Sequence, residues 1–345
     1  MKITQIMLTQ GFGGAERYFL DLSLALADLD YQIQVICHPK FQYKAKLENH
    51  PNITLSPVRG YGTWDPWAGH NIKKQLQEFQ PQVVHTHLSR GAWLGGKSAA
   101  KLNIPTLASI HNYIKLKRYQ YIDIFIPSTL DEKTFLINQG IPPSNIEHIP
   151  HFSRLSPVVQ PRTLPNDPVF IALGRLVKKK GMDVLLQAFA HYLQQGGKGI
   201  LKIGGDGAEA KTLLDLSHQL NIMDKVTFCG WVDDVAKFLK QGDIFILPSF
   251  DEPFGIVVLE AMALGLPIIT TQTQGPLEIL SAESAYFVPI QDQVALAEAM
   301  KEATHNPECT YQKAAASLNL YKTQYTFAAL APQMQALYQR AVNLT

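Results

Sequence analysis

Short apolar segments alternate with helix-length amphipathic segments along nearly the whole chain, and this alternation restricts the fold more than any other feature. In the first half, strands are predicted at residues 2–8, 32–37, 53–58, 82–86, 105–109, 122–126 and 146–149, with helices at 14–29, 68–79, 91–102 and 130–138. Most strand segments are rich in apolar residues, which is typical of strands covered on both faces. The pattern therefore predicts a doubly wound α/β domain built on a parallel sheet.

The same pattern starts again after a proline-rich stretch that contains Pro157, Pro161, Pro165 and Pro168. Strands are predicted at residues 169–173, 200–203, 226–229, 244–247, 267–270 and 285–288, and helices at 182–194, 209–220, 235–240, 255–264 and 294–304. From residue 307 onward the pattern is purely helical. A length of 345 residues fits two domains. We expect one domain at residues 1–156, a second at 157–322, and a C-terminal helix at 323–345 that packs back on the first.

Composition excludes several classes of protein. Hydrophobic residues make up 46% of the chain and charged residues 17%, which is enough apolar material for two ordered cores. The three cysteines show no CxxC spacing, so neither a zinc site nor a disulfide framework is expected. No run of 18 apolar residues occurs. We therefore expect a cytoplasmic protein, with peripheral attachment to the inner face of a membrane as an open alternative.

Positive charge is concentrated in the first half of the chain. Residues 1–150 contain 15 Lys and Arg against 11 Asp and Glu, whereas residues 151–345 contain 16 against 18. One basic segment is interleaved with tyrosines: Lys97, Lys101, Lys115, Lys117 and Arg118, with Tyr113, Tyr119 and Tyr121. Such a surface suits an anionic membrane or an acidic acceptor, and a solvated rim is the alternative. Nucleic acid is not an expected partner, because no recognised binding motif is present.

A glycine-rich turn follows the first predicted strand. Gly13 and Gly14 open the first helix, so their backbone N–H groups could approach a phosphate or an acceptor hydroxyl. The dinucleotide-binding pattern needs a further glycine where Glu16 stands, which argues against an NAD-dependent enzyme. A tight turn that binds no ligand is the alternative.

Two further loops follow strands in the second half. In the segment 174–181, after Gly174, Arg175 offers a planar fork for phosphate oxygens, and Lys180 places a point charge at the start of a helix. Together they could neutralise a leaving diphosphate. The loop 204–207, which contains Gly205, allows close backbone approach but lacks the Gly-Lys-Ser/Thr of a P-loop.

The segment 247–260 leads from a strand into an apolar helix. Backbone N–H groups of Phe254, Gly255 and Ile256 at the first turn suit sugar hydroxyls or phosphate oxygens. Glu252 lies just before the helix and Glu260 within it, so the two carboxylates would meet different parts of a ligand. Because Glu260 lies in an apolar stretch it needs a partner, and a structural salt bridge is the alternative to a binding role.

Together these residues resemble the retaining glycosyltransferase family 4 (glycosyl transferases group 1), whose members have the GT-B fold of two facing Rossmann-like domains. The most specific motifs are Gly-Arg-Leu-x-x-x-Lys-Gly at 174–181 and Glu-x-Phe-Gly-x-x-x-x-Glu at 252–260. The resemblance implies an acceptor-binding first domain and a donor-binding second domain. Arg175 and Lys180 would bind the donor diphosphate, Glu252 the transferred sugar and Glu260 the ribose.

The resemblance also assigns residues outside these motifs. Val232 would offer backbone groups to the base, and His111 would contact the sugar near the reaction centre. The expected catalytic residues are Arg175, Lys180, Glu252 and His111; the expected donor-binding residues are Gly13, Gly14, Gly174, Gly205, Val232, Phe254, Gly255, Ile256 and Glu260. The chain departs from the family where Gln274 precedes Gly275, because two glycines are common there.

Two sequence patterns suggest a metal, but neither is expected to bind one. His85 and His87 share one face of a strand end, without a carboxylate or cysteine at ligand spacing, so acceptor binding or packing is favoured. Asp28 and Asp30 match the DxD of metal-dependent transferases but precede a strand, at the wrong edge of the sheet.

The expected function is therefore a retaining, metal-independent glycosyltransferase without a cofactor. It would move a hexose from a UDP- or GDP-sugar to a glycan or glycolipid acceptor, for example in lipopolysaccharide or another cell-surface polysaccharide. Two alternatives stay open: a nucleotide-sugar epimerase or phosphorylase of the same fold, and a non-catalytic nucleotide-sugar-binding subunit.

Overall fold

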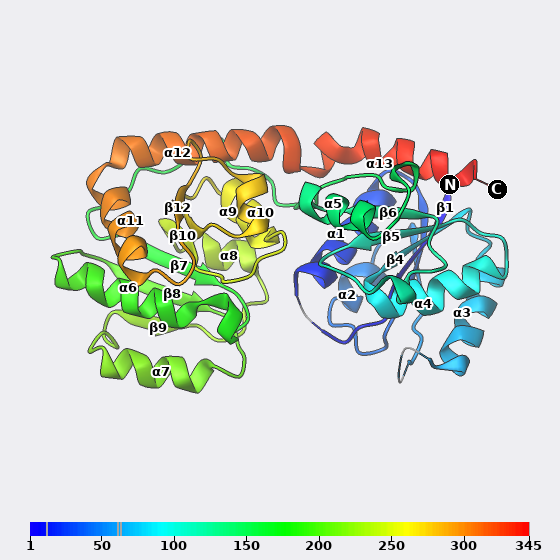
Figure 1. Cartoon of the computed structure of the whole chain (residues 1–345), viewed down its shortest axis with the longest axis horizontal. Coiled ribbons are helices and arrows are strands. Elements are labelled where there is room, and N and C mark those ends of the chain that lie inside the picture. Colours follow the sequence, from blue (N-terminus) through cyan, green and yellow to red (C-terminus); the bar gives the residue numbers. More distant parts are fainter. Residues whose placement is uncertain (12, 61, 63, 345) are drawn as a thin grey trace. The chain divides into compact units, whose positions relative to one another are not determined.

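The chain forms two structural units. A computed structural model describes residues 1–11, 13–60, 62 and 64–344 (Figure 1). Unit 1 comprises Met1–Arg154 and Phe327–Thr345, and unit 2 comprises Leu155–Thr326. The chain thus leaves unit 1 at residue 154 and returns to it at residue 327, close to the expected boundaries at 156 and 323.

Unit 1 is built on a six-stranded parallel sheet with the order β3-β2-β1-β4-β5-β6. Its strands are β1 (Lys2–Met7), β2 (Gln32–Cys37), β3 (Ile53–Leu55), β4 (Val83–His87), β5 (Thr106–Ile110) and β6 (Ile124–Pro127). Its helices are α1 (Gly14–Asp28), α2 (Lys44–Glu48), α3 (Pro66–Phe79), α4 (Leu88–Ala100), η1 (Leu116–Arg118), α5 (Leu130–Asn138), η2 (Pro143–Asn145) and α13 (Phe327–Val342).

The strand predicted at residues 146–149 is wrong. Ile146 forms only an isolated bridge with Phe125. The segment runs beside β6, where Glu147 and Ile149 donate backbone hydrogen bonds to the carbonyls of Phe125 and Pro127. Because Pro127 has no N–H group, β6 cannot return a hydrogen bond there, and the ladder does not continue.

Unit 2 repeats the architecture with the order β12-β11-β10-β7-β8-β9. Its strands are β7 (Val169–Leu173), β8 (Ile200–Gly204), β9 (Val226–Phe228), β10 (Ile244–Leu247), β11 (Ile268–Thr271) and β12 (Tyr286–Val288). Its helices are η3 (Lys178–Lys180), α6 (Met182–Gln194), α7 (Ala210–Gln219), α8 (Val235–Leu239), α9 (Ile256–Ala263), α10 (Gln274–Ile279), α11 (Gln293–His305), α12 (Pro307–Leu320) and the π-helical turn η4 (Tyr321–Tyr325).

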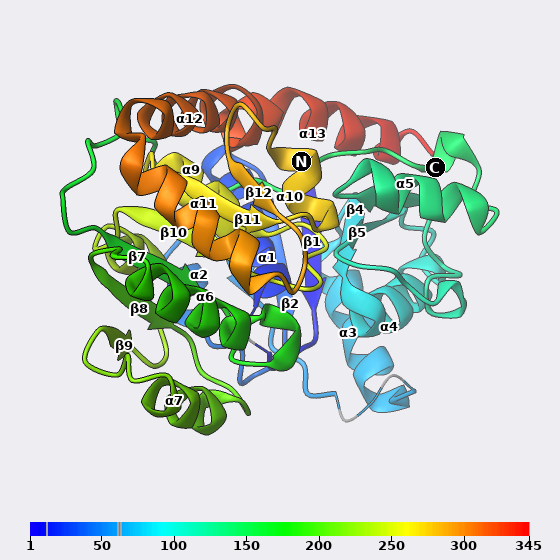
Figure 2. The same cartoon turned by 60° about the vertical axis from the view of Figure 1, so that its left-hand side comes forward.

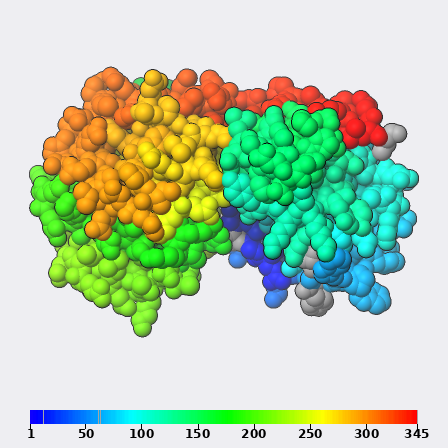
Figure 3. Space-filling model, viewed as in Figure 1, coloured from blue at the N-terminus to red at the C-terminus, as the bar shows by residue number. Residues whose placement is uncertain are grey.

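The core of unit 2 lies between its sheet and two helices. α6 and α11 pack side by side (Figures 1 and 2) and share one buried cluster with residues of β7, β8, β10 and β11. Residues of α11 and α12, orange in Figure 3, lie together on the visible face of this unit. The proline-rich stretch belongs to unit 2, where Val158 donates to the carbonyl of Ala263 at the end of α9.

Both sheets reverse their strand order at one place. β1 lies between β2 and β4, and β7 lies between β8 and β10, so successive connections run to opposite sides of the central strand. In open parallel sheets of this kind, ligands bind beyond the carboxyl ends of the strands at the reversal point. The loops after β1, β4, β7 and β10 are therefore where a site is expected.

Local signals set the start of α3. Asp65 accepts hydrogen bonds from the N–H groups of Trp67 and Ala68, each at 3.0 Å, and Pro66 occupies the first helical position of α3.

Among the described residues, no helix is both long enough and apolar enough to cross a bilayer.

Candidate active site

The two most specific sequence motifs meet at the reversal point of unit 2. Lys180, from the loop after β7, and Glu252, from the loop after β10, form an ion pair with Nζ and Oε2 2.5 Å apart. The two side chains are only 15% and 10% exposed. Ser249 donates a further, longer hydrogen bond of 3.4 Å to Glu252. The fold therefore joins a cation and a carboxylate that lie 72 positions apart in the chain.

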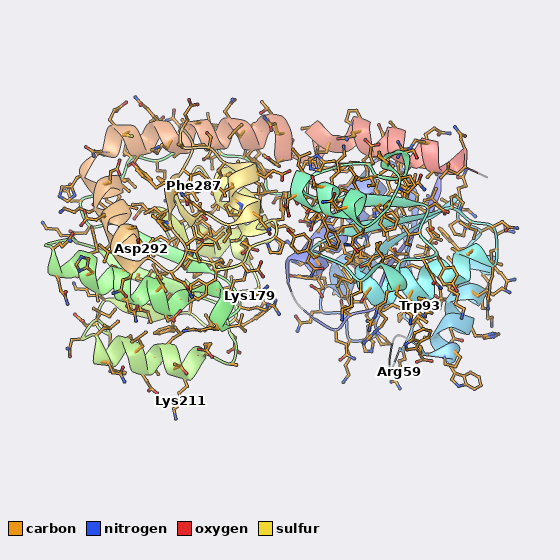
Figure 4. The ribbon with its side chains drawn as sticks, viewed as in Figure 1. Arg59, Trp93, Lys179, Lys211, Phe287 and Asp292 are labelled. Atoms are coloured by element: carbon orange, nitrogen blue, oxygen red, sulfur yellow. The ribbon has the colours of Figure 1, made fainter. Side chains whose placement is uncertain are left out.

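Close backbone contact holds these two loops together. Phe250 donates its N–H to the carbonyl of Lys179 at 2.8 Å, and the Lys179 ammonium pairs with Asp251 at 2.9 Å (Lys179 is labelled in Figure 4). Gly181 has a φ of +65°, and a Cβ atom there would overlap the carbonyl oxygen of Pro248. Only glycine allows this approach, which keeps Lys180 beside Glu252.

The glycine loop after β8 lies against the loop after β7. Gly174 donates its N–H to the carbonyl of Gly204 at 3.1 Å, and Gly205 donates to Gly230 at 2.7 Å. A Cβ at Gly204 would lie 2.8 Å from a methyl carbon of Val232. Three predicted parts of the donor site are therefore neighbours at the carboxyl edge of one sheet. They are the segment 174–181 for the diphosphate, the glycine loop 204–207, and Val232 for the base.

The start of α9 completes this edge. Gly255, with a φ of +93°, caps the helix, and a Cβ there would lie 3.2 Å from Cγ of Glu252. Phe254 and Ile256 have buried side chains, and Glu260 is buried within the helix. The α9 N-terminus thus places its partial positive charge beside the Lys180–Glu252 pair.

The departure at Gln274 has a structural explanation. Gly275 donates its N–H to the carbonyl of Glu252 at 3.0 Å, and a Cβ at this position would overlap the carbonyl oxygen of Phe254. The retained glycine therefore supports the loop that carries Glu252. Gln274 is exposed at the first position of α10, so this position tolerates a side chain.

Arg175 differs from Lys180 in having no internal counterion. The Arg175 side chain is exposed. This side chain forms no hydrogen bond or ion pair with any residue that the structure describes. A cation that is not neutralised internally can accept the charge of a phosphate group.

Unit 1 contains a hydrogen-bonded row of histidines, which explains His85 and His87 without a metal. His111 lies between His151, at 3.0 Å, and His87, at 3.3 Å. The row ends at Gln5, whose Oε1 lies 2.8 Å from Nε2 of His87. His85 bonds Tyr338 of α13 at 2.6 Å and Ser109 at 2.9 Å. Among the described residues, no group of three or more His, Cys, Asp or Glu side chains is arranged to hold a metal ion.

The Gln5 amide fixes the protonation of this row. Gln5 donates from Nε2 to the Tyr338 hydroxyl at 3.0 Å, so its carbonyl oxygen accepts from Nε2–H of His87. His87 then accepts at Nδ1 from Nε2–H of His111, which in turn accepts from His151. Burial lowers the pKa of His111 to about 3, so the ring is neutral near pH 7.

The glycine turn of unit 1 is faced by a carboxylate. Glu16 lies in the first turn of α1 and accepts from the Thr9 hydroxyl at 2.9 Å. A Cβ at Gly13 would lie 3.3 Å from its second oxygen. The residue that breaks the dinucleotide pattern therefore places negative charge beside Gly11 and Gly13.

The structure groups the predicted residues by unit. Unit 2 holds Gly174, Arg175, Lys180, Gly205, Val232, Glu252, Phe254, Gly255, Ile256 and Glu260, whereas unit 1 holds Gly13, Gly14 and His111. Sequence reasoning missed His151 and Gln5, because neither belongs to a motif. Asp28 ends α1 and pairs with Arg154 and His50, and Leu29 and Asp30 form the predicted turn. Tyr119 is only 3% exposed, so its place in the basic surface is wrong: it packs in the core.

Comparison with known proteins decides the family. The model for Glycosyltransferase Family 4 matches residues 12–156, and that for Glycosyl transferases group 1 matches residues 159–319. An uncharacterized glycosyltransferase of Methanocaldococcus jannaschii is 37% identical over 280 residues, covering 73% of this chain and 69% of the relative. The chain belongs to glycosyltransferase family 4. It is therefore a glycosyltransferase, as the motifs of unit 2 predicted.

Further similarities extend over the whole glycosyltransferase. The lipopolysaccharide core biosynthesis glycosyltransferase LpsD of Rhizobium meliloti is 27% identical over 336 residues, covering 96% of each chain. The structure of Anabaena HepE in complex with UDP-glucose matches with a TM-score of 0.84 at 18% identity, covering 99% of this chain and 100% of that one. This structural likeness confirms the predicted GT-B fold.

Proposed function

We propose that the protein is a retaining, metal-independent hexosyltransferase that uses a UDP- or GDP-sugar and a glycan or glycolipid acceptor. The observation that carries this proposal is the Lys180–Glu252 ion pair at the reversal point of unit 2, together with the internally unpaired Arg175 of the same loop as Lys180. The UDP-glucose complex of HepE and the lipopolysaccharide role in the name of LpsD support the donor and acceptor classes.

In the proposed reaction, unit 2 stabilises the leaving group. As the bond between the sugar's anomeric carbon and the phosphate oxygen breaks, negative charge grows on the diphosphate. Arg175, Lys180 and the α9 N-terminus receive this charge, while Glu252 binds hydroxyls of the transferred sugar. The acceptor oxygen attacks the face that the phosphate leaves, and its proton passes to the departing phosphate oxygen.

A substitution at Arg175 tests this assignment. Arg175→Ala is expected to lower turnover about 10²-fold or more, as for loss of a preorganised charge stabiliser. Lys211→Ala, an exposed cation on α7 (labelled in Figure 4), is the charge-matched control and should transfer normally. Near-wild-type transfer by Arg175→Ala would refute the assignment.

Activity should persist in EDTA, and an absolute Mg²⁺ or Mn²⁺ requirement would refute the metal-independent mechanism.

The proposal includes a cytoplasmic enzyme attached to an anionic membrane surface. Trp64 and Trp67, near the start of α3, are 67% and 78% exposed. The Trp64 ring packs on Trp93 with centroids 4.5 Å apart, and the Lys97 ammonium lies over Trp93 (labelled in Figure 4). Exposed tryptophan beside lysine suits the interface of an anionic bilayer.

Vesicle sedimentation tests this attachment. The enzyme should pellet with vesicles containing phosphatidylglycerol but not with phosphatidylcholine alone, and Trp67→Ser should reduce the bound fraction several-fold. The exposed Trp231→Ser, in unit 2, is the control. Equal binding by Trp67→Ser and the wild-type enzyme would show that this surface is not the attachment site.

A further inference from the structure

Three cationic residues lie near one histidine at the carboxyl edge of the unit 1 sheet. His38 directly follows β2, and its Nδ1 accepts the N–H of Lys40 at 3.0 Å. Val58 donates to the carbonyl of Cys37 at 2.8 Å, which places Arg59 beside the end of β2. Arg90, in the first turn of α4, donates to the carbonyl of Leu8 at 3.2 Å, just after β1. The three cations thus come from two different loops and from the first turn of α4.

These cations have no internal counterion, unlike several others in unit 1. Arg17, Arg154 and Arg340 each pair with a carboxylate. Lys40, Arg59 and Arg90 form no ion pair with any described residue. Holding like charges together without a carboxylate is unfavourable, so such a cluster is typical of a site that binds an anion.

The buried histidine supports this grouping. Nδ1 of His38 accepts the Lys40 N–H, and its Nε2 lies 3.1 Å from Nε2 of the Gln10 amide. Burial lowers the pKa of His38, and the charges of Arg90, Lys40 and Arg59 lower it further. The three positive charges therefore all act on the same imidazole.

We infer that Lys40, Arg59 and Arg90 form a binding site for a phosphate group carried by the acceptor. This inference rests on the proposed function and narrows its acceptor to an anionic one. The donor's diphosphate is already provided for in unit 2 by Arg175 and Lys180. Guanidinium groups match phosphate oxygens in a bidentate manner, which favours phosphate for Arg59 (labelled in Figure 4) and Arg90. The nearby N-terminus of α1 is already faced by Glu16, so phosphate binding here depends on side chains.

Calorimetric titration with inorganic pyrophosphate tests the site. The full-length enzyme is first saturated with whichever of UDP and GDP raises its melting temperature, so that the donor site is filled. Pyrophosphate should still bind, and Arg59→Gln and Arg90→Gln should each weaken it at least about tenfold, as for loss of a charge-assisted hydrogen bond. Lys2→Gln, which removes a positive charge at the opposite edge of the same sheet, should not change the affinity.

Three results would overturn the inference. The first is that pyrophosphate does not bind to the nucleotide-loaded enzyme. The second is that the Arg59→Gln and Arg90→Gln variants bind pyrophosphate as tightly as the wild-type enzyme. The third is that Lys2→Gln weakens binding as much as the two arginine substitutions do. If neither UDP nor GDP binds, the proposed function fails. The same titration of the nucleotide-free Arg175→Gln variant then still tests the second anion site.

Discussion

At the scale of single residues, Lys180 and Glu252 act as one unit. Each is largely shielded from water, so removal of one partner leaves the other as an uncompensated charge. For fully buried pairs this costs about 3–5 kcal/mol. The cost is smaller here, because both side chains keep some contact with solvent.

A double-mutant cycle measures this coupling. Lys180→Met and Glu252→Gln should each lower the free energy of unfolding by about 1–3 kcal/mol, and the double variant should recover part of that loss. All three variants should lose transfer activity, because both groups are needed for the donor. Urea denaturation and a transfer assay provide the two readouts. Strictly additive stability losses would show that the pair is not coupled.

The sequence predicted both residues but not their pairing. The motifs marked Lys180 and Glu252 because loops between strands and helices are recognisable from glycine and proline spacing. Their contact depends on β7 and β10 being neighbours in the sheet, which no local signal specifies. The histidine row shows the same limit: His111 was recognisable at a strand end, whereas its partner His151 follows a segment that does not form a strand.

At the scale of elements, glycines with positive φ let three loops meet at the carboxyl edge of unit 2. Gly205 has a φ of +130°, and a Cβ there would overlap the carbonyl oxygen of Gly174. Gly196, after α6, has a φ of +88° but nothing within 4 Å of a Cβ. Comparing an added Cβ atom at the two positions separates the free-energy cost of backbone strain, which both share, from the cost of a steric clash, which only Gly205 has.

Alanine at these two glycines tests the loop arrangement. Gly196→Ala should cost only the strain of a left-handed residue, about 1–2 kcal/mol. Gly205→Ala should cost at least about 2 kcal/mol more and should weaken nucleotide binding, because the loop after β7 must move. Thermal unfolding with and without UDP or GDP measures both effects. Equal losses of stability at the two positions would contradict the close approach of Gly205 to Gly174.

Hydrophobic periodicity predicted most elements, and the errors have local causes. The regular βα pattern predicted a strand at each of the twelve observed strands, because buried parallel strands are rich in apolar residues. The segment 146–149, which has isoleucine at both ends, was also predicted as a strand, but it lies beside a proline of β6. The short helices α2 and α10 were missed, because each is too short to show a full amphipathic repeat.

At the scale of the whole molecule, the chain passes twice from one unit to the other. Within unit 2, the Tyr321 hydroxyl donates to the carbonyl of Leu155 at 2.6 Å, so the two crossing segments are joined there. Beyond residue 326, α13 returns to unit 1, where Tyr338 is fully buried. Its hydroxyl contacts His85 and Gln5, so the last helix supports the histidine row.

Removing this hydroxyl should destabilise unit 1. Tyr338→Phe leaves buried polar atoms of Gln5 and His85 without their partner, at a cost of about 1–3 kcal/mol. Tyr311→Phe, on α12 of unit 2, is the matched control. Urea denaturation followed by tryptophan fluorescence compares the two. An unchanged midpoint in Tyr338→Phe would show that this contact does not hold α13 on unit 1.

The return of α13 has a consequence for synthesis on the ribosome. Unit 2 is one continuous stretch of chain and can fold as soon as it has emerged. Unit 1 consists of two separate stretches, residues 1–154 and 327–345, so the first stretch stays incompletely covered while all of unit 2 is made. A frameshift or early stop within the codons of α13 would thus damage the domain whose synthesis started first.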